Sequence, residues 1–361
     1  MLFKKKNKLM IGVDISSTSI KMLELSRSGS GYRVESYAVE PLLEGAVNEK
    51  TIRDEQMVGR VVAKLKQRTR TKLSHAAVAV AGSAVISKII DVQPMDDEDE
   101  LEAYIESEAE QYIPFAREEV ALDYYLIGPS PSNPDMYQVY LAACKQDDVD
   151  ARTDALKLGG LQVQDVDLES LAIERAFRMV APQLGNTGLA EDDLVAVVDI
   201  GHTNMTINVL RGGQIIYTRD QAFGGAQLTQ EIMRTYGMSH SEAGLAKKQP
   251  ANLPADYESE ILLPFMDSLI QQIQRSFQYF YASNGSSSNE MSLLVIAGGT
   301  ACLPGLADLI QEKLGTRTLL ANPFANMQVS NKVNLANLTN DAPALMIACG
   351  LAMRSFEDGK Y

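Results

Sequence analysis

The sequence is poor in the residues that build disulfide frameworks and metal clusters. It has three histidines, no tryptophan and three cysteines, and Cys144, Cys302 and Cys349 stand singly in apolar stretches. This spacing predicts neither paired disulfides nor a zinc site, so we expect a reduced, cytoplasmic protein. No run approaches the length of about 18 apolar residues that a membrane-spanning helix requires. We therefore expect no direct transmembrane segment.

The sequence also lacks the excess of basic residues that general nucleic-acid binding needs. Its 33 Lys and Arg residues face 47 Asp and Glu residues, which gives a formal net charge of −14. A nucleic-acid binder needs a basic face to displace counterions from phosphates, so we expect no nucleic-acid partner. The basic start of the chain, with lysines at 4, 5, 6 and 8, fits either a solvated tail or a weak attraction to an anionic membrane surface.

Length and composition indicate a folded protein larger than one ordinary domain. The 361 residues are 45% hydrophobic and 22% charged, which favours two lobes or a domain that carries an insertion. In the first half, apolar and alternating runs predict strands at 9–14, 20–26, 32–39 and 76–81, with a helix at 55–67.

An acidic segment then interrupts this pattern. Residues 96–110 contain nine acidic and no basic side chains, with apolar positions at helical spacing. This predicts an amphipathic helix whose acidic face is either solvated or a docking surface for a basic partner. Strands at 121–127 and 136–144, a helix at 147–158 and a strand at 163–166 follow. We interpret these elements as an inserted αββαβ subdomain over residues 95–164.

The remaining sequence predicts a second lobe and a return to the first. We expect a first-lobe core at 1–94, completed by 165–190, a second lobe at 191–340 and a C-terminal helix at 341–361 that packs on the first lobe. The second lobe contains a predicted hairpin at 194–218, a helix after Gly224 and Gly225, and a strand at 292–297.

The two predicted lobes begin with the same motif. Residues 13–18 read Val-Asp-Ile-Ser-Ser-Thr and residues 198–203 read Val-Asp-Ile-Gly-His-Thr, each between two β-rich runs. Two such matches in equivalent contexts predict duplicated lobes. A small hydroxylated turn lets backbone N–H groups approach phosphate oxygens. Asp14 and Asp199 can hold Mg²⁺ through water, and Lys21 can reach a phosphate as a point charge.

A third element fits the same nucleotide site. Residues 293–297 form a predicted strand that ends at Gly298 and Gly299. Two glycines there allow a flat ring or a sugar-phosphate to approach the backbone closely. Because all three elements suit a nucleotide, the sequence predicts ATP and Mg²⁺ as ligands between the lobes.

These elements resemble the nucleotide signature of the superfamily of actin, sugar kinases and Hsp70. The inserted subdomain is similar to that of the cell-division protein FtsA and of the type IV pilus assembly proteins of the PilM family. The stretches 11–21, 223–229, 241–248 and 344–354 resemble the PilM family most closely. The resemblance implies an α/β, actin-like fold of two duplicated ribonuclease H-like lobes, with an FtsA-type inserted subdomain in the first lobe.

The resemblance also implies roles for individual residues. The first phosphate loop would comprise Asp14, Ser16, Ser17, Thr18 and Lys21, and the second Asp199, Gly201, His202, Thr203 and Asn204. Gly225 would begin a helix near the phosphates and Lys247 would contact the ribose. Gly298, Gly299 and Thr300 would border the adenosine.

The sequence departs from actin-like hydrolases at positions that matter for hydrolysis. A good hydrolase positions water with a carboxylate or amide near the terminal phosphate, and Glu169 is the candidate for this role. Glu169 also suits the start of a helix, where a carboxylate complements the dipole. Related ATPases carry a glutamate where Gly244 stands, and its absence weakens the expected ribose contact. We therefore expect at most a weak ATPase.

PilM-family resemblance implies a scaffold function in type IV pilus biogenesis and twitching motility. The expected partner is the N-terminal cytoplasmic peptide of PilN, in a groove between the first lobe and the inserted subdomain. PilO, PilP and the motor ATPase would be indirect partners at the cytoplasmic face of the inner membrane. The sequence has no long C-terminal amphipathic helix like that of FtsA, so membrane attachment would be peripheral. An FtsA-like filament former and a sugar-kinase-type phosphotransferase stay as alternatives, and self-association is left open.

Overall fold

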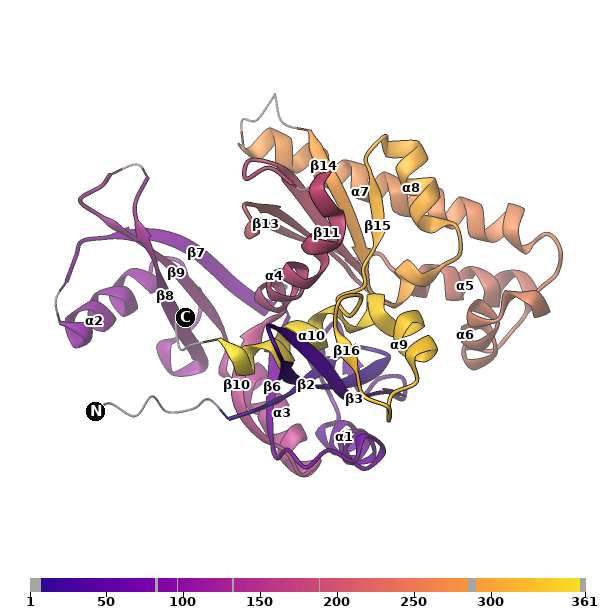
Figure 1. Cartoon of the computed structure of the whole chain (residues 1–361), viewed down its shortest axis with the longest axis horizontal. Helices are drawn as coiled ribbons and strands as arrows, with labels where there is room; N and C mark the ends of the chain where they lie inside the picture. The colour runs from indigo at the N-terminus through magenta and orange to yellow at the C-terminus, as the bar shows by residue number, and fades with distance from the viewer. Residues whose placement is uncertain are drawn as a thin grey trace.

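Two large sheets share one strand order in the computed structural model (Figure 1). The structure describes residues 8–81, 84–95, 97–131, 133–187, 189–284 and 290–357, so the lysines before Lys8 lie outside it. The first sheet has the order β10-β6-β1-β2-β3-β16. Its strands are β1 (Ile11–Ile15), β2 (Ser19–Ser28), β3 (Gly31–Pro41), β6 (His75–Val80), β10 (Gln162–Leu168) and β16 (Gln328–Val329).

The second sheet repeats the arrangement of the first. Its order is β13-β12-β11-β14-β15, with β11 (Leu194–Ile200), β12 (Met205–Arg211), β13 (Gln214–Gln221), β14 (Met291–Ala297) and β15 (Thr318–Leu320). Both β1 and β11 pair antiparallel with the following strand and parallel with a later one. The predicted duplication is therefore confirmed as a shared topology.

Two helices lie between the sheets and join the lobes into one core. They are α4 (Glu169–Val180) and α10 (Met346–Met353), and α10 is buried along its whole length. Small residues allow the close approach, because a Cβ on Gly350 would lie 1.8 Å from the Ala172 carbonyl oxygen. Likewise, a Cβ on Gly12 would lie 2.1 Å from the Ala348 carbonyl oxygen. The end of the chain thus returns to the first lobe, and residues 358–361 of the expected C-terminal segment lie outside the described residues.

The outer faces of the two sheets are covered by amphipathic helices. Helices α1 (Glu55–Thr69) and α3 (Gln146–Leu158) cover the first sheet, and α5 (Gly225–Tyr236), α7 (Leu263–Asn284) and α8 (Leu306–Leu314) cover the second. In α1, Val58, Val62 and Leu65 recur at helical spacing and are fully buried. The remaining α-helices of the two lobes are α6 (His240–Lys248) and α9 (Leu335–Asp341). None of the described helices is both long and apolar enough to cross a membrane.

The inserted subdomain is a three-stranded sheet with one covering helix. Strands β7 (Val85–Val92), β9 (Tyr137–Lys145) and β8 (Val120–Pro129) are antiparallel, and α2 (Glu98–Ala109) packs on one face. Ile105 of α2 is fully buried against Val139 and Leu141 of β9. The acidic segment thus forms the predicted helix, apart from residue 96, which lies outside the described residues.

The subdomain differs at both ends from the expected range of 95–164. Strand β7 belongs to it but was not predicted, because Ser87 and Lys88 interrupt the apolar pattern of residues 85–92. Helix α3 and strand β10 were expected in the subdomain, yet α3 packs on α1 and β10 pairs with β6 in the first sheet. Parallel pairing with β6 places β10 at the edge of the first sheet, so the αββαβ order is wrong and the observed order is βαββ.

Candidate functional site

The two phosphate-loop candidates are closed by equivalent hydrogen bonds. In the first loop the Ser16 amide donates to the Ser19 carbonyl at 3.0 Å, and in the second the Gly201 amide donates to the Asn204 carbonyl at 2.9 Å. Each bond joins the second and fifth residues after the loop aspartate. The matching motifs therefore form the same turn in both lobes, with Ser17 and Thr18 at one tip and His202 and Thr203 at the other.

The first loop carries its own counter-ion. Asp14 is 4% exposed and lies beside Lys21 in the β1–β2 register. The Lys21 ammonium donates to Asp14 Oδ2 at 2.7 Å and to Ser16 Oγ at 3.2 Å. In this hairpin the lysine therefore neutralises the aspartate and remains next to the turn where a phosphate would bind.

The second loop is bound to the start of α5. The Gly225 amide donates to the Gly201 carbonyl at 3.0 Å, and the Ala226 amide donates to the His202 carbonyl at 2.7 Å. A Cβ on Gly224 would lie 2.6 Å from both of these carbonyl oxygens. Glycine at 224 thus allows the helix to begin against the loop.

The adenosine and ribose candidates converge on the same helix start. Thr300 Oγ1 donates to the Gly201 carbonyl at 2.7 Å, and Lys247 Nζ donates to the Gly225 carbonyl at 2.9 Å. Gly298 has φ +87°, and a Cβ there would lie 2.5 Å from Asp199 Oδ1. Gly299 has open space around its Cβ position. The structure therefore brings together predicted residues that are up to 99 positions apart in sequence.

Burial lowers the pKa of two basic groups in this region. Burial, with the neighbouring Lys248 charge, lowers the pKa of Lys247 to about 8. Burial and the Lys247 charge lower the pKa of His202 to about 4. His202 is therefore neutral at pH 7, which suits a turn residue or hydrogen-bond donor.

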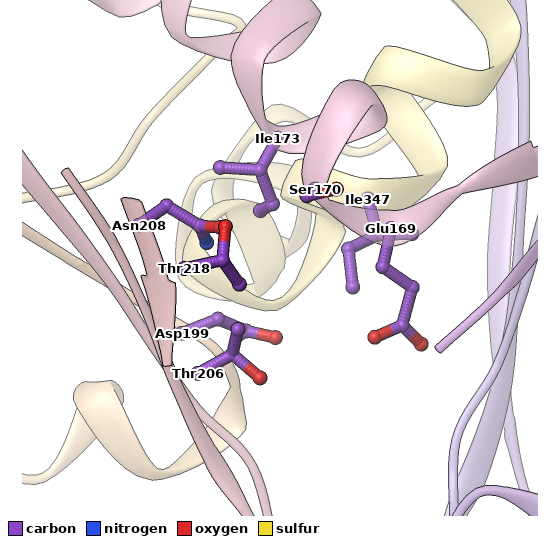
Figure 2. A pocket seen from close by; sticks show the side chains of 8 residues that line it. All are labelled: Glu169, Ser170, Ile173, Asp199, Thr206, Asn208, Thr218 and Ile347. Carbon is purple, nitrogen blue, oxygen red and sulfur yellow. The ribbon is translucent and has the colours of Figure 1, made fainter. Parts of the chain in front are cut away.

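Glu169 and Asp199 face one space from opposite sides. Figure 2 shows Glu169, the first residue of α4, and Asp199 on β11 with their carboxylates directed into the space between them. Burial raises the pKa of each carboxylate, and the Lys50 charge opposes that rise in both. Lys50 Nζ forms an ion pair with Glu169 Oε2. None of the described residues donates a hydrogen bond to the Asp199 carboxylate.

The structure adds two residues that the sequence did not single out. Lys50 reaches this space from the loop between β3 and α1, and Asp220 lies on β13 at the position paired with Thr206. Thr206 Oγ1 donates to Asp220 Oδ1 at 2.6 Å. The charges of Lys50 and Asp220 both shift the pKa of Asp199. We call Asp14, Lys21, Lys50, Glu169, Asp199 and Asp220 the interlobe charge cluster.

A small cavity with mixed polar and apolar walls lies beside this cluster. It is lined by Glu169, Ser170, Ile173, Asp199, Thr206, Asn208, Thr218 and Ile347 (Figure 2). Its volume of about 10 Å³ leaves room for roughly one water molecule. Asn208 is fully buried and its Nδ2 has no hydrogen-bond partner among the described residues.

A larger cavity lies where the inserted subdomain meets both lobes. Its volume is about 300 Å³, at the lower end of the range for ligand pockets. The inserted subdomain contributes Val85, Ile86, Ser87 and Tyr140, and the lobes contribute Leu168, Ser170, Thr218 and Asp220. Ser170 and Thr218 also line the small cavity, so the two cavities adjoin.

The charge cluster fits a hydrated divalent ion better than a directly bound one. Among the residues that the structure describes, no three His, Cys, Asp or Glu side chains are placed to hold a metal ion together. The loop aspartates offer carboxylate oxygens, which Mg²⁺ prefers, and Mg²⁺ keeps several of its waters in protein sites. Asp14 and Asp199 therefore fit Mg²⁺ through water.

Known proteins match both the fold and the chain length. A solved structure described as the PilM-PilN type IV pilus biogenesis complex aligns with a TM-score of 0.81 and 26% identity, over 97% of this chain and 99% of that chain. The ethanolamine utilization protein EutJ from Carboxydothermus hydrogenoformans aligns with a TM-score of 0.54 and 18% identity, over 96% of this chain and 90% of that chain. The EutJ likeness supports the fold alone.

Part of the chain also matches a cell-division protein. The Bacillus subtilis (strain 168) cell division protein FtsA is 25% identical over 186 residues, which is 45% of this chain and 40% of that protein. The duplicated topology and these likenesses define an actin-like ATPase fold. The family model "Type IV pilus assembly protein PilM" matches residues 12–356. The chain belongs to this PilM family.

Proposed function

We propose that this chain is a nucleotide-binding scaffold of the type IV pilus machine that binds the N-terminal cytoplasmic peptide of a PilN-type membrane protein. The carrying observation is the likeness to the PilM-PilN complex structure over 97% of the chain. The family match over residues 12–356 favours this function over an FtsA-like filament or a sugar-kinase-type phosphotransferase.

Mg²⁺ and ATP are the proposed ligands of the interlobe charge cluster. Asp14 and Asp199 would hold Mg²⁺ through water, and bound Mg²⁺ would neutralise phosphate charge. Loop residues 16–18 and 201–204, together with Lys21, would bind phosphates. Lys247 would contact the ribose, and Gly298, Gly299 and Thr300 would border the base. The convergence of Gly201, Gly225, Lys247 and Thr300 through hydrogen bonds supports this assignment.

Retention of the nucleotide is the proposed purpose of the site, with hydrolysis at most slow. Glu169 is the candidate for positioning water, and its carboxylate is paired with Lys50. A carboxylate that accepts a hydrogen bond from an ammonium has fewer lone pairs free to orient a water. The adjoining cavity has room for roughly one water beside Glu169.

The larger cavity supports the proposed peptide site. It combines residues of β7 and β9 in the inserted subdomain with Leu168 and Ser170 of the first lobe, so it lies at the expected boundary. It also contains Thr218 and Asp220 of the second lobe. A peptide there would contact both lobes, so its affinity would depend on the relative position of the lobes.

Through PilN the chain would be peripheral at the inner membrane and would act with PilO, PilP and the motor ATPase in pilus biogenesis and twitching motility.

The direct test is calorimetric titration with a synthetic peptide that matches the N-terminal cytoplasmic segment of a PilN-type protein from the same organism. We expect saturable binding, and no binding of a scrambled peptide. Ser87→Trp should fill the larger cavity and displace the peptide from it. We expect peptide binding to weaken by at least about tenfold, which corresponds to about 1.4 kcal/mol. Ser268→Trp, on the exposed face of α7, is the matched control and should bind like the wild type.

Two outcomes would count against the proposal. Absence of peptide binding at high micromolar concentration would remove the partner assignment. Equal loss of binding in Ser87→Trp and Ser268→Trp would show that the larger cavity is not the peptide site. A separate titration with Mg·ATP tests the nucleotide half of the proposal.

A further inference from the structure

Lys50 stands at the tip of a tight hairpin whose backbone is unusual for its sequence. Strands β4 (Val47–Asn48) and β5 (Thr51–Ile52) pair antiparallel and leave Glu49 and Lys50 as the two turn residues. Both have positive φ, at 45° and 70°. Turns of this kind strongly favour Asn-Gly, because residues with a Cβ are strained in the left-handed region. The hairpin therefore keeps a long cationic side chain where glycine would be more favourable.

A buried arginine fixes the hairpin tip. Arg152 of α3 is 3% exposed and donates from Nη2 to the Lys50 carbonyl at 2.7 Å. It also donates to the carbonyls of Asp148 at 2.7 Å and Ala79 at 2.8 Å. One hydrogen bond thus ties the strained backbone to Arg152, and the other two fix Arg152 itself in the first lobe. Strain that the surrounding fold maintains in this way is typical of functional positions.

The hairpin directs the Lys50 ammonium between the lobes. The side chain is 16% exposed and pairs with Glu169 at the start of α4. Burial alone would lower the pKa of Lys50, but the charges of Glu169, Asp199 and Asp220 raise it above its ordinary value. The ammonium is therefore charged at any physiological pH. It is attracted to carboxylates of both lobes, in the space next to Asp199.

We propose that Lys50 is the resident cation of the interlobe charge cluster, which admits Mg²⁺ only together with a nucleotide. This inference rests on the proposed Mg·ATP site. With all groups ionised, the cluster holds four carboxylates, Asp14, Glu169, Asp199 and Asp220, against the two ammonium groups of Lys21 and Lys50. Lys21 is already paired with Asp14. Lys50 is paired with Glu169, and its charge also acts on Asp199 and Asp220 of the second lobe.

Competition with the tethered Lys50 ammonium explains why we expect the site to bind Mg²⁺ carried by ATP and not free Mg²⁺. A tethered group acts at an effective concentration on the order of millimolar or higher, and Mg²⁺ gives up its hydration shell reluctantly. A free dication therefore gains little by displacing Lys50. Mg²⁺ that arrives on ATP brings phosphate oxygens as ligands, and the contacts of these phosphates with the two loops offset the cost of displacing the ammonium.

The test measures binding of metal alone to the full-length, nucleotide-free protein, with Mn²⁺ followed by electron paramagnetic resonance and Mg²⁺ by calorimetry. The wild type should bind neither ion saturably below several millimolar, as expected for competition with a tethered cation. Lys50→Met should create one saturable site that is at least about tenfold tighter, because the cluster loses a positive charge at short range. Lys50→Arg should behave like the wild type.

Two variants separate charge from backbone strain. Lys50→Gly removes the ammonium and relaxes the left-handed backbone, so it should bind metal like Lys50→Met even if the methionine variant folds poorly. Glu49→Gly relaxes the neighbouring turn residue and keeps Lys50, so it should match the wild type. Equal metal affinity in the wild type, Lys50→Met and Lys50→Gly would overturn the proposal.

A parallel titration with Mg·ATP distinguishes this inference from the function on which it rests. Removal of the competing ammonium should strengthen Mg·ATP binding several-fold. A loss of about tenfold or more in Lys50→Met and Lys50→Gly would identify Lys50 as a phosphate ligand and would overturn its role as a competitor. Failure of the wild type to bind Mg·ATP at all would refute the proposed nucleotide site, whatever the metal titrations give.

Discussion

The two hairpins proposed to bind phosphate share four of six motif residues and the same turn, yet their aspartates have different partners. Asp14 is paired with Lys21 of its own hairpin at 2.7 Å. Asp199 receives no hydrogen bond from the described residues, and the cation that most affects its pKa, Lys50, comes from the other lobe. Duplication has therefore conserved the turn while the counter-ion differs. Asp14 is neutralised within its own hairpin, whereas the charge of Asp199 is balanced by groups that lie between the lobes.

The largest expected effect comes from removing each loop aspartate. Asp14→Ala and Asp199→Ala should both abolish detectable Mg·ATP binding in calorimetry, because each removes a carboxylate that would hold hydrated Mg²⁺. Unchanged affinity in either variant would contradict the site assignment. Only Asp14→Ala should also lower the free energy of unfolding, by about 3 kcal/mol, because it leaves the buried Lys21 ammonium unpaired. Chemical denaturation would test this difference.

A smaller effect should follow from crowding the second loop. A Cβ on Gly225 would lie 2.6 Å from Thr300 Oγ1 and 2.9 Å from Lys247 Nζ. Gly225→Ala should therefore displace both side chains, at a cost of about 1–3 kcal/mol in nucleotide binding. Gly244→Ala is the matched control, because nothing lies within 4 Å of its Cβ position. Similar nucleotide affinities for the two variants would exclude a role for this convergence of side chains.

The pH dependence of nucleotide binding should reflect Lys247. Its pKa is lowered to about 8 by burial, so the ammonium that would attract the nucleotide is charged below pH 8 and lost above it. Affinity for Mg·ATP should fall several-fold between pH 7 and 9. Lys247→Arg stays charged throughout this range and should flatten the profile. The sign for stability is opposite, because a lowered lysine pKa makes the folded state more stable as pH rises from about 8 towards the unfolded value.

The smallest effect is expected at the exposed contact between the lobes. His240 Nδ1 lies 3.8 Å from Glu44 Oε2, with side chains 43% and 80% exposed. Exposed ion pairs contribute little, so His240→Ala should change the free energy of unfolding by no more than about 0.5 kcal/mol. A larger change in thermal or chemical denaturation would mean that lobe closure depends on this outer contact as well as on the interlobe charge cluster.

Much of the fold was predictable because the chain repeats itself. The matched motifs at Asp14 and Asp199 gave the duplicated lobes, and the shared strand order confirms them. The extent of the inserted subdomain was not predictable from sequence order. Helix α3 and strand β10 follow its strands along the chain, but β10 pairs with β6, and only that distant pairing places it in the first lobe.

The interlobe charge cluster was predictable only in part, for a related reason. Asp14, Lys21, Asp199 and Glu169 lie in or beside recognisable motifs. Lys50 lies between strands of two residues each, too short for an alternating pattern, and Glu49 and Lys50 are not typical turn residues. Its proximity to Glu169 spans 119 positions and depends on the packing of Arg152.

We propose that the site between the lobes binds a nucleotide and that the affinity for the partner peptide changes when it does. The most direct test is one calorimetric comparison of peptide affinity in the absence and presence of saturating Mg·ATP. The larger cavity includes residues of both lobes, so we expect the two affinities to differ by about fivefold or more, which is the usual range of coupling between linked sites. Asp199→Ala should abolish the difference. Identical peptide affinity with and without Mg·ATP in the wild type would contradict the claim.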